Sequence, residues 1–290
     1  MLSNILAVAV GITCVRYATG VTAASEGKGQ VVVFGDDLGD TGNLQKLTND
    51  STIGYNDGRL TNGPTFAEYM ATAMGRSFKS YAYANATVDN EWIPSVVEKH
   101  PVPALSEQII EFTESERDWI RRKSGIHQSI AVVSAGTTDV RELSKLGFEG
   151  IAVTNLPALY ITPRWRMSAS VDVLRDFVTE ANMLFRKSLI ENEQSVKETK
   201  LWLLDLESFL LVTANSTFSK TIGAKNSTHA CISELGSCAD PADFVFYDDI
   251  HMDVRLNHML GLAAANMAGG GDIQYNSTYF GKLASDYEIG

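Results

Sequence analysis

The side chains best suited to chemistry lie near the two ends of the chain. Asp36 and Asp37 follow an apolar run, and Asp248 and His251 stand three residues apart near the C-terminus. Carboxylates and an imidazole can move protons or hold a divalent metal ion. As metal ligands, however, Asp36, Asp37 and His251 lack a diagnostic local spacing. We therefore predict no metal and no other cofactor.

The sequence lacks the serine elbow of the α/β-hydrolases. No G-x-S-x-G pattern occurs anywhere in the chain. Ser134 lies inside a predicted strand, which makes it a poor candidate for a substitute nucleophile. Any chemistry must therefore come from the acidic residues and the histidine, and from the elements that position them.

Short apolar runs alternate with segments of helical periodicity along the chain. This alternation predicts an α/β protein with parallel βαβ units in a doubly wound sheet, formed by one domain over residues 25–290. Functional groups in such folds lie at the carboxyl ends of the strands, and Asp36 and Asp37 stand just after the first strand. The strands are expected at 31–34, 77–83, 130–133, 150–154 and 201–204, and the helices at 64–74, 103–119, 171–190 and 254–267.

The composition is that of a folded, acidic protein. The 290 residues are 44% hydrophobic and 20% charged, which excludes a disordered chain and a coiled coil. The formal net charge is −11. Nucleic acids and anionic membrane surfaces are therefore poor partners, because both require a basic face.

The N-terminus has the pattern of a secretory signal peptide. Residues 5–15 form an apolar run that is shorter than the ~20 residues of a membrane-spanning helix, and small residues follow at 18–24. We expect a signal peptide over residues 1–24, with cleavage within 18–24, and a secreted mature protein with no transmembrane segment. The alternative is that the apolar run forms a buried first strand.

Loss of the signal peptide would remove Cys14 and leave two of the three cysteines. Cys231 and Cys238 can form a disulfide in an oxidising compartment, the alternative being two free thiols. Five sequons mildly favour a glycosylated eukaryotic protein. The candidate glycosylation sites are Asn49, Asn85, Asn215, Asn226 and Asn276.

Four blocks of the sequence resemble the GDSL (SGNH) ester hydrolases. Residues 34–43 read F-G-D-D-L-G-D-T-G-N where the family reads F-G-D-S-L-S-D-T-G-N, and residues 58–64 are similar to its G-R-x-[ST]-N-G-P. Residues 155–163 resemble N-L-P-P-L-x-x-T-P, and residues 247–251 resemble W-D-x-x-H. The resemblance implies a single-domain, three-layer α/β/α sandwich with a parallel, flavodoxin-like sheet.

The resemblance also implies acyl transfer from an ester to water. In the family a serine attacks, a histidine takes its proton, and an aspartate three residues earlier orients the histidine. Asp248 and His251 match this pair. The nucleophile position, however, is Asp37. The two positions that complete the oxyanion hole, a glycine and an asparagine in the family, are Asn85 and Thr138.

These three replacements argue against ordinary serine-ester hydrolysis. Asp37 has no hydroxyl, and its charge beside a developing oxyanion costs ~4 kcal/mol. Loss of one oxyanion donor slows such reactions roughly 10²–10³-fold. Asn85 keeps its backbone N–H and tolerates the left-handed conformation that glycine adopts. Asp37 is also a good helix N-cap, which alone would explain its residue type.

The predicted function is that of a secreted pseudoenzyme of the lipase and esterase class. Its cleft would bind a small ester, a lipid, an acylated carbohydrate or a protein partner, and we expect a monomer. The alternative is an altered hydrolase of carboxylic esters in which His251 and Asp37 activate water. A third hypothesis is a decoy for the partner of an active paralogue. Between Asp37 and Asp248, His251 is expected to favour its charged form.

Overall fold

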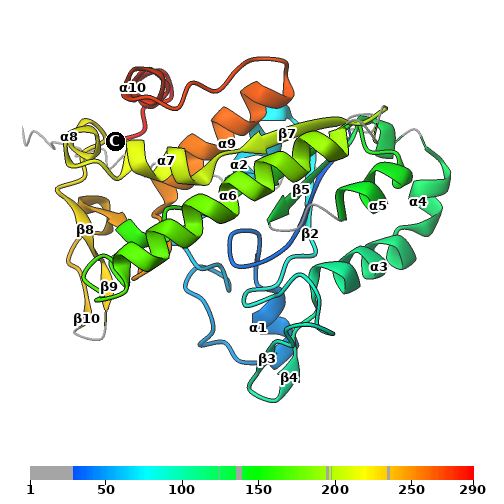
Figure 1. Ribbon diagram of the computed structural model, residues 1–290, viewed down its shortest axis with the longest axis horizontal. Helices are drawn as coiled ribbons and strands as arrows, with labels where there is room; N and C mark the ends of the chain where they lie inside the picture. Colours follow the sequence, from blue (N-terminus) through cyan, green and yellow to red (C-terminus); the bar gives the residue numbers. More distant parts are fainter. Residues whose placement is uncertain (1–28, 124, 135–138, 194–195, 197, 234–235) are drawn as a thin grey trace, which may run out of the picture.

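A computed structural model describes residues 29–123, 125–134, 139–193, 196, 198–233 and 236–290. Within these residues a five-stranded sheet forms the centre of the molecule, with the strand order β2-β1-β5-β6-β7 (Figure 1). All four neighbouring pairs are parallel. The strands are β1 (Gln30–Phe34), β2 (Ser77–Ser80), β5 (Ile130–Ser134), β6 (Gly150–Thr154) and β7 (Lys200–Leu204).

Helices and short hairpins occupy the connections between these strands. The described helices are α1 (Asn43–Thr48), α2 (Phe66–Met74), α3 (Leu105–Ser115), α4 (Arg117–Arg121), α5 (Asp139–Leu146), α6 (Val171–Glu193), α7 (Leu206–Thr213), α8 (Ser216–Thr221), α9 (Val254–Ala268) and α10 (Ser277–Asp286). The short strands are β3 (Val96–Val97), β4 (His100–Pro101), β8 (Asn226–Ala230), β9 (Ile232–Ser233), β10 (Gly236–Ser237) and β11 (Phe244–Phe246).

Helices cover both faces of the sheet, which gives three layers (Figure 1). Alternate side chains of β1 enter two separate cores, as the pleat of a strand requires. Val31 and Val33 pack with α2 and α9, whereas Val32 and Phe34 pack with α3 and α5. The prediction of a parallel, doubly wound α/β sheet is therefore confirmed. Counted along the chain, the five strands have the flavodoxin-like order 2-1-3-4-5, which reverses direction between β1 and β5.

Three predicted elements are shorter than expected, among them the helix predicted at 64–74, which begins at Phe66. The helix predicted at 103–119 divides at Glu116, whose φ of −105° and ψ of 17° end α3 before α4 begins. The strand predicted at 77–83 ends at Ser80. Beyond Ser80 the backbone N–H groups of Tyr81 and Tyr83 still donate to the carbonyl oxygens of Val33 and Gly35, while the side-chain amide of Asn43 donates to the carbonyl oxygens of Ser80 and Ala82.

The predicted disulfide is confirmed, since Cys231 and Cys238 are bonded at the base of the β9–β10 hairpin. No helix among the described residues combines the length and the apolar character needed to cross a membrane. The predicted signal peptide and Cys14 lie outside the described residues.

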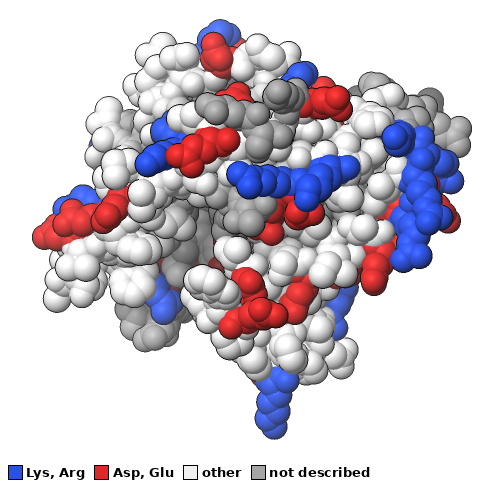
Figure 2. Space-filling view, turned by 45° about the vertical axis from the view of Figure 1, so that its right-hand side comes forward, with Lys and Arg blue, Asp and Glu red and all other residues white. Residues whose placement is uncertain are grey.

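Charged side chains are mixed over the surface. On the face that Figure 2 shows, Lys and Arg form short groups beside Asp and Glu, with uncharged side chains between them. This face differs from the broad basic surface that nucleic acid binding requires.

Candidate functional site

Asp248 and His251 share one turn between β11 and α9. Asp248 Oδ1 accepts hydrogen bonds from the backbone N–H groups of Ile250 (2.9 Å) and His251 (2.6 Å), so the carboxylate holds the turn that carries the ring. The distance from His251 Nδ1 to Asp248 Oδ2 is 2.8 Å. An aspartate in this place fixes the orientation of the ring and keeps a proton on Nδ1.

Asp37 faces the opposite nitrogen of the same ring. It lies in the loop after β1, at the carboxyl edge of the sheet. Its Oδ2 is 3.4 Å from His251 Nε2, and its Oδ1 accepts a hydrogen bond of 2.6 Å from the backbone N–H of Asn85. Asp37 thus joins the distant pair of Asp248 and His251 in a carboxylate–imidazole–carboxylate array, and both ring nitrogens face a carboxylate.

Asn85 has a backbone conformation that glycine commonly adopts. Its φ is +64°, in the left-handed region that asparagine tolerates better than most residues. The side chain is exposed, while the backbone N–H points to Asp37. The backbone N–H that we expected Asn85 to keep as a donor is thus bonded to the Asp37 carboxylate.

The carboxylate of Asp40, and not that of Asp37, accepts hydrogen bonds from the backbone N–H groups at the start of α1. The Asp40 side chain is fully buried and accepts four backbone N–H bonds, from Gly42, Asn43, Leu44 and Ala84. Helix α1 begins at Asn43. The interpretation of Asp37 as a helix N-cap is therefore wrong, because no helix begins within reach of its side chain.

The side chain of Gln108 is hydrogen-bonded to the backbone of Gly35, at the start of the loop that carries Asp37. This residue of α3 is fully buried, and its Oε1 accepts from the Gly35 N–H (2.7 Å) while its Nε2 donates to the Gly35 carbonyl (2.9 Å). The same Nε2 donates to the carbonyl of Pro103 (2.9 Å). Gln108 was not foreseen from the sequence, where it appears as one polar residue within a helical segment.

Gly35→Ala is expected to lower the free energy of unfolding by about 1–3 kcal/mol. Gly35 has a φ of +125°, which is nearly confined to glycine, and an added Cβ would lie 2.6 Å from the Ser134 carbonyl oxygen. Urea unfolding measures the effect. Gly270→Ala is the matched control, because its φ is +94° and its Cβ would meet no described atom within 4 Å. Equal losses in both variants would contradict the proposed clash.

The interactions within the array shift the pKa values of its titratable groups. Burial alone would lower the pKa of His251, but hydrogen bonds to Asp248 and Asp37 and their charges raise it to about 10. Burial would raise the pKa values of Asp37 and Asp248, yet their bonds to His251 hold both below the usual range. Burial and the charge of Asp37 raise the pKa of Asp36 to about 6. His251 is thus an imidazolium at neutral pH, as expected, beside an excess of negative charge.

Tyr55 is a further contact of the array that the sequence did not indicate. Its hydroxyl donates to Asp248 Oδ2 (3.0 Å), and its ring packs edge-on against Tyr247. Burial and the Asp248 charge raise the pKa of Tyr55, which keeps the hydroxyl protonated and able to donate. In the sequence, Tyr55 lies between residues 34–43 and 58–64, two of the blocks that resemble the ester hydrolases. The sequence does not predict the path of the loop that contains it.

An apolar cavity of about 170 Å³ opens beside the array. Asp36, Asp37 and His251 form its polar end. A cavity of about 150 Å³ accommodates benzene, so this one can hold a ring of that size or a short alkyl chain. Its apolar walls are Leu38, Leu156, Pro157, Leu159, Leu206, Phe209, Leu210, Ile250 and Met252.

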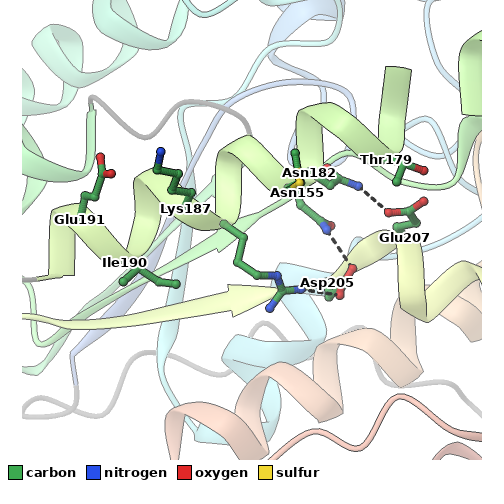
Figure 3. Close-up of a pocket in the computed structure, with 10 residues that line it drawn as sticks. Asn155, Thr179, Asn182, Lys187, Ile190, Glu191, Asp205 and Glu207 are labelled. Atoms are coloured by element: carbon green, nitrogen blue, oxygen red, sulfur yellow. Dashed lines mark hydrogen bonds and ion pairs between the residues drawn. The ribbon is translucent and has the colours of Figure 1, made fainter. Parts of the chain in front are cut away.

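A wider cavity of about 560 Å³ lies against α6 (Figure 3). Five of its polar side chains are paired with one another: Asp205 accepts from Asn155 (2.8 Å) and Arg186 (2.9 Å), and Glu207 accepts from Asn182 (2.9 Å). It contains neither Asp37 nor His251. The smaller cavity is therefore the candidate site.

The remaining predicted positions are spread over the molecule. Thr138 lies outside the described residues. Ser134 is buried at the end of β5, in agreement with its dismissal as a nucleophile. Within the described parts of the chain, no group of three or more His, Cys, Asp and Glu side chains is arranged to hold a metal ion. Four sequon asparagines are exposed and Asn226 is half-buried; the exposed ones are Asn49, Asn85, Asn215 and Asn276.

Comparison with known proteins gives one distant relative to consider. No protein-family model matches the chain. The chain is similar to the secreted effector protein SseJ of Salmonella typhimurium strain LT2, with 21% identity over 253 residues. The match covers 80% of this chain and 62% of SseJ. The chain therefore spans less than two thirds of that relative's length, and the activity of the whole relative does not carry over from this match.

Proposed function

We propose that the chain is a GDSL/SGNH-type protein whose ester-hydrolase site has become a ligand-binding site. The main support for this proposal is the position of the Asp37 carboxylate. One of its oxygens faces His251 Nε2 and the other takes the Asn85 N–H. In the family that the sequence resembles, these groups would receive the serine proton and stabilise the oxyanion. Here a carboxylate occupies both.

The charge on His251 supports the same proposal. A general base must be unprotonated at the working pH. Its two carboxylate partners raise the pKa of His251 to about 10, which keeps the ring protonated at pH 7. The ring then joins two carboxylates and serves as a structural cation.

The cavity suggests the kind of ligand. Its walls suit a ring or an alkyl chain, and its polar end offers carboxylate oxygens, which accept hydrogen bonds and attract cations. We therefore propose a small amphiphile with an uncharged donor or a cationic head. Secretion is part of the proposal, supported by the disulfide and by the likeness to a protein named as a secreted effector.

An esterase assay tests the loss of catalysis. Wild-type protein and a His251→Ala variant are incubated with p-nitrophenyl butyrate and with a fluorophosphonate probe for active serines. We expect no labelling and no difference in turnover between the two proteins. Turnover that disappears in the His251→Ala variant would overturn the proposal in favour of an altered hydrolase.

Hexylammonium is expected to bind the cavity at least tenfold more tightly than hexanoate, because Asp36 and Asp37 repel a carboxylate. Calorimetric titration at pH 7.5 measures both affinities. Asp36→Asn should weaken binding of the ammonium ion, whereas Glu191→Gln, a matched change in the other cavity, should leave it unchanged. Equal affinity for the two compounds would contradict the proposed charge preference.

A further inference from the structure

The loop of residues 87–101 presents large apolar side chains to solvent. Trp92 is 85% exposed, Ile93 68%, Val96 60% and Val88 43%. The loop leaves the sheet after β2 and carries the β3–β4 hairpin, which stands at one extremity of the molecule (Figure 1). It begins two residues after Asn85, so it belongs to the same edge of the sheet as Asp37.

Polar bonds hold this loop in a defined conformation. Asn90 Oδ1 accepts from the Ser95 N–H (3.0 Å), and Asn90 Nδ2 donates to the Val102 carbonyl and to Glu107, both at 2.8 Å. Thr87 Oγ1 donates to the Ile93 carbonyl (2.8 Å). These hydrogen bonds thus fix the loop in a conformation that exposes its apolar side chains to water, which is unfavourable in free energy.

The size and shape of this apolar tip favour one kind of partner. Four side chains on a projecting loop are far fewer than the ~20–30 residues that each side of a stable protein interface contributes. Tryptophan, by contrast, is suited to the boundary between lipid headgroups and acyl chains, because its ring is apolar and its N–H is polar.

The charges around the tip indicate which lipid surface it fits. The loop contains three acidic residues, Asp89, Glu91 and Glu98, and one basic residue, Lys99. Electrostatic attraction to an anionic lipid surface would therefore contribute little to binding. We propose that the 87–101 loop docks on the surface of neutral, zwitterionic lipids by inserting Trp92 and Ile93. This docking brings the edge of the sheet that carries Asp37 to the lipid, and it does not depend on whether the site is catalytic.

Co-sedimentation with phosphatidylcholine vesicles tests the proposal on the intact protein. Wild-type protein should bind, with a blue shift of tryptophan emission that is lost in Trp92→Phe. Ile93→Gln should weaken binding at least tenfold. Ile190→Gln, a matched change at an isoleucine of α6 that is 56% exposed, should bind like the wild type. Thermal unfolding of each variant confirms that it is folded.

Three results would overturn the proposal. They are no binding of wild-type protein to phosphatidylcholine vesicles, equal losses in Ile93→Gln and Ile190→Gln, and binding that requires phosphatidylserine and is abolished by salt. The last result would assign the interaction to charges rather than to the apolar tip.

Discussion

A variant that combines Asp37→Ser, Asn85→Gly and Thr138→Asn is expected to hydrolyse p-nitrophenyl esters that the wild-type protein leaves intact. The serine supplies a hydroxyl and removes the carboxylate from His251 Nε2, which lowers the pKa of His251 towards the range of a general base. The asparagine restores an oxyanion donor worth roughly 10²–10³ in rate. The triple variant should therefore exceed Asp37→Ser alone by about 100-fold or more in kcat/KM.

The control for this gain is His251→Ala in the triple-variant background, which should return the rate to that of the wild type. A fluorophosphonate probe should label the triple variant and not the wild-type protein. An inactive, correctly folded triple variant would contradict the assignment of Asp37, Asn85 and Thr138 to the three family positions.

Asp248→Asn is expected to lower the free energy of unfolding by about 3–5 kcal/mol at pH 6, because it breaks a buried ion pair and leaves His251 without its main partner. Chemical unfolding measures this loss. Asp249→Asn is the matched control. Its carboxylate is about half exposed and pairs with Arg164 at 3.4 Å, so its loss should cost no more than about 1 kcal/mol. Similar losses in both variants would contradict the ion-pair account.

The pH dependence of wild-type stability follows from the same array. The pKa of His251 is raised in the folded protein to about 10 from its ordinary value of about 6.5, so its contribution is complete below about pH 6.5 and is lost as the pH rises through 10. The carboxylates of Asp37 and Asp248 have lowered pKa values, so their contribution is present above about pH 3.8 and is lost as the pH falls. Asp37, Asp248 and His251 together should therefore stabilise the fold most between about pH 4 and 6.5, whereas the contribution of Asp36, whose pKa is raised to about 6, falls as the pH rises through that value.

Unfolding midpoints measured from pH 4 to pH 10 check the sign. Stability should decline from pH 6.5 to 10, and the decline should be much smaller in Asp248→Asn. A wild-type stability that rises over this interval would contradict an imidazolium at His251.

The elements of the sheet could be predicted because their signals are local. Residues 150–154 form an uninterrupted run of small and β-branched side chains, and they are the strand β6 with every residue buried. Gly75 ends α2 with a φ of +61°, as its position after an apolar periodic segment indicates. Such patterns need no knowledge of the rest of the chain.

The partners within the site depend on long-range contacts that no local pattern encodes. Tyr55 reaches Asp248 across 193 positions of sequence, and Gln108 reaches Gly35 across 73. The N-cap interpretation of Asp37 was wrong because the local pattern also fits Asp40, and only the folded chain shows which carboxylate is surrounded by N–H groups. The apolar cavity brings together four separate segments, so its existence could not be derived from any one of them.

The amide of Gln108 joins the segment that carries Asp37 to the chain that follows the 87–101 loop. It holds Gly35, next to the Asp37 segment, and the carbonyl of Pro103, two residues beyond the lipid-facing loop. A shift of that loop on a lipid surface would strain one side chain that both segments share. Binding at the surface and binding in the cavity would then be thermodynamically linked, and each would change the affinity of the other by the same factor. Hexylammonium affinities measured with and without phosphatidylcholine vesicles would give the size of this coupling.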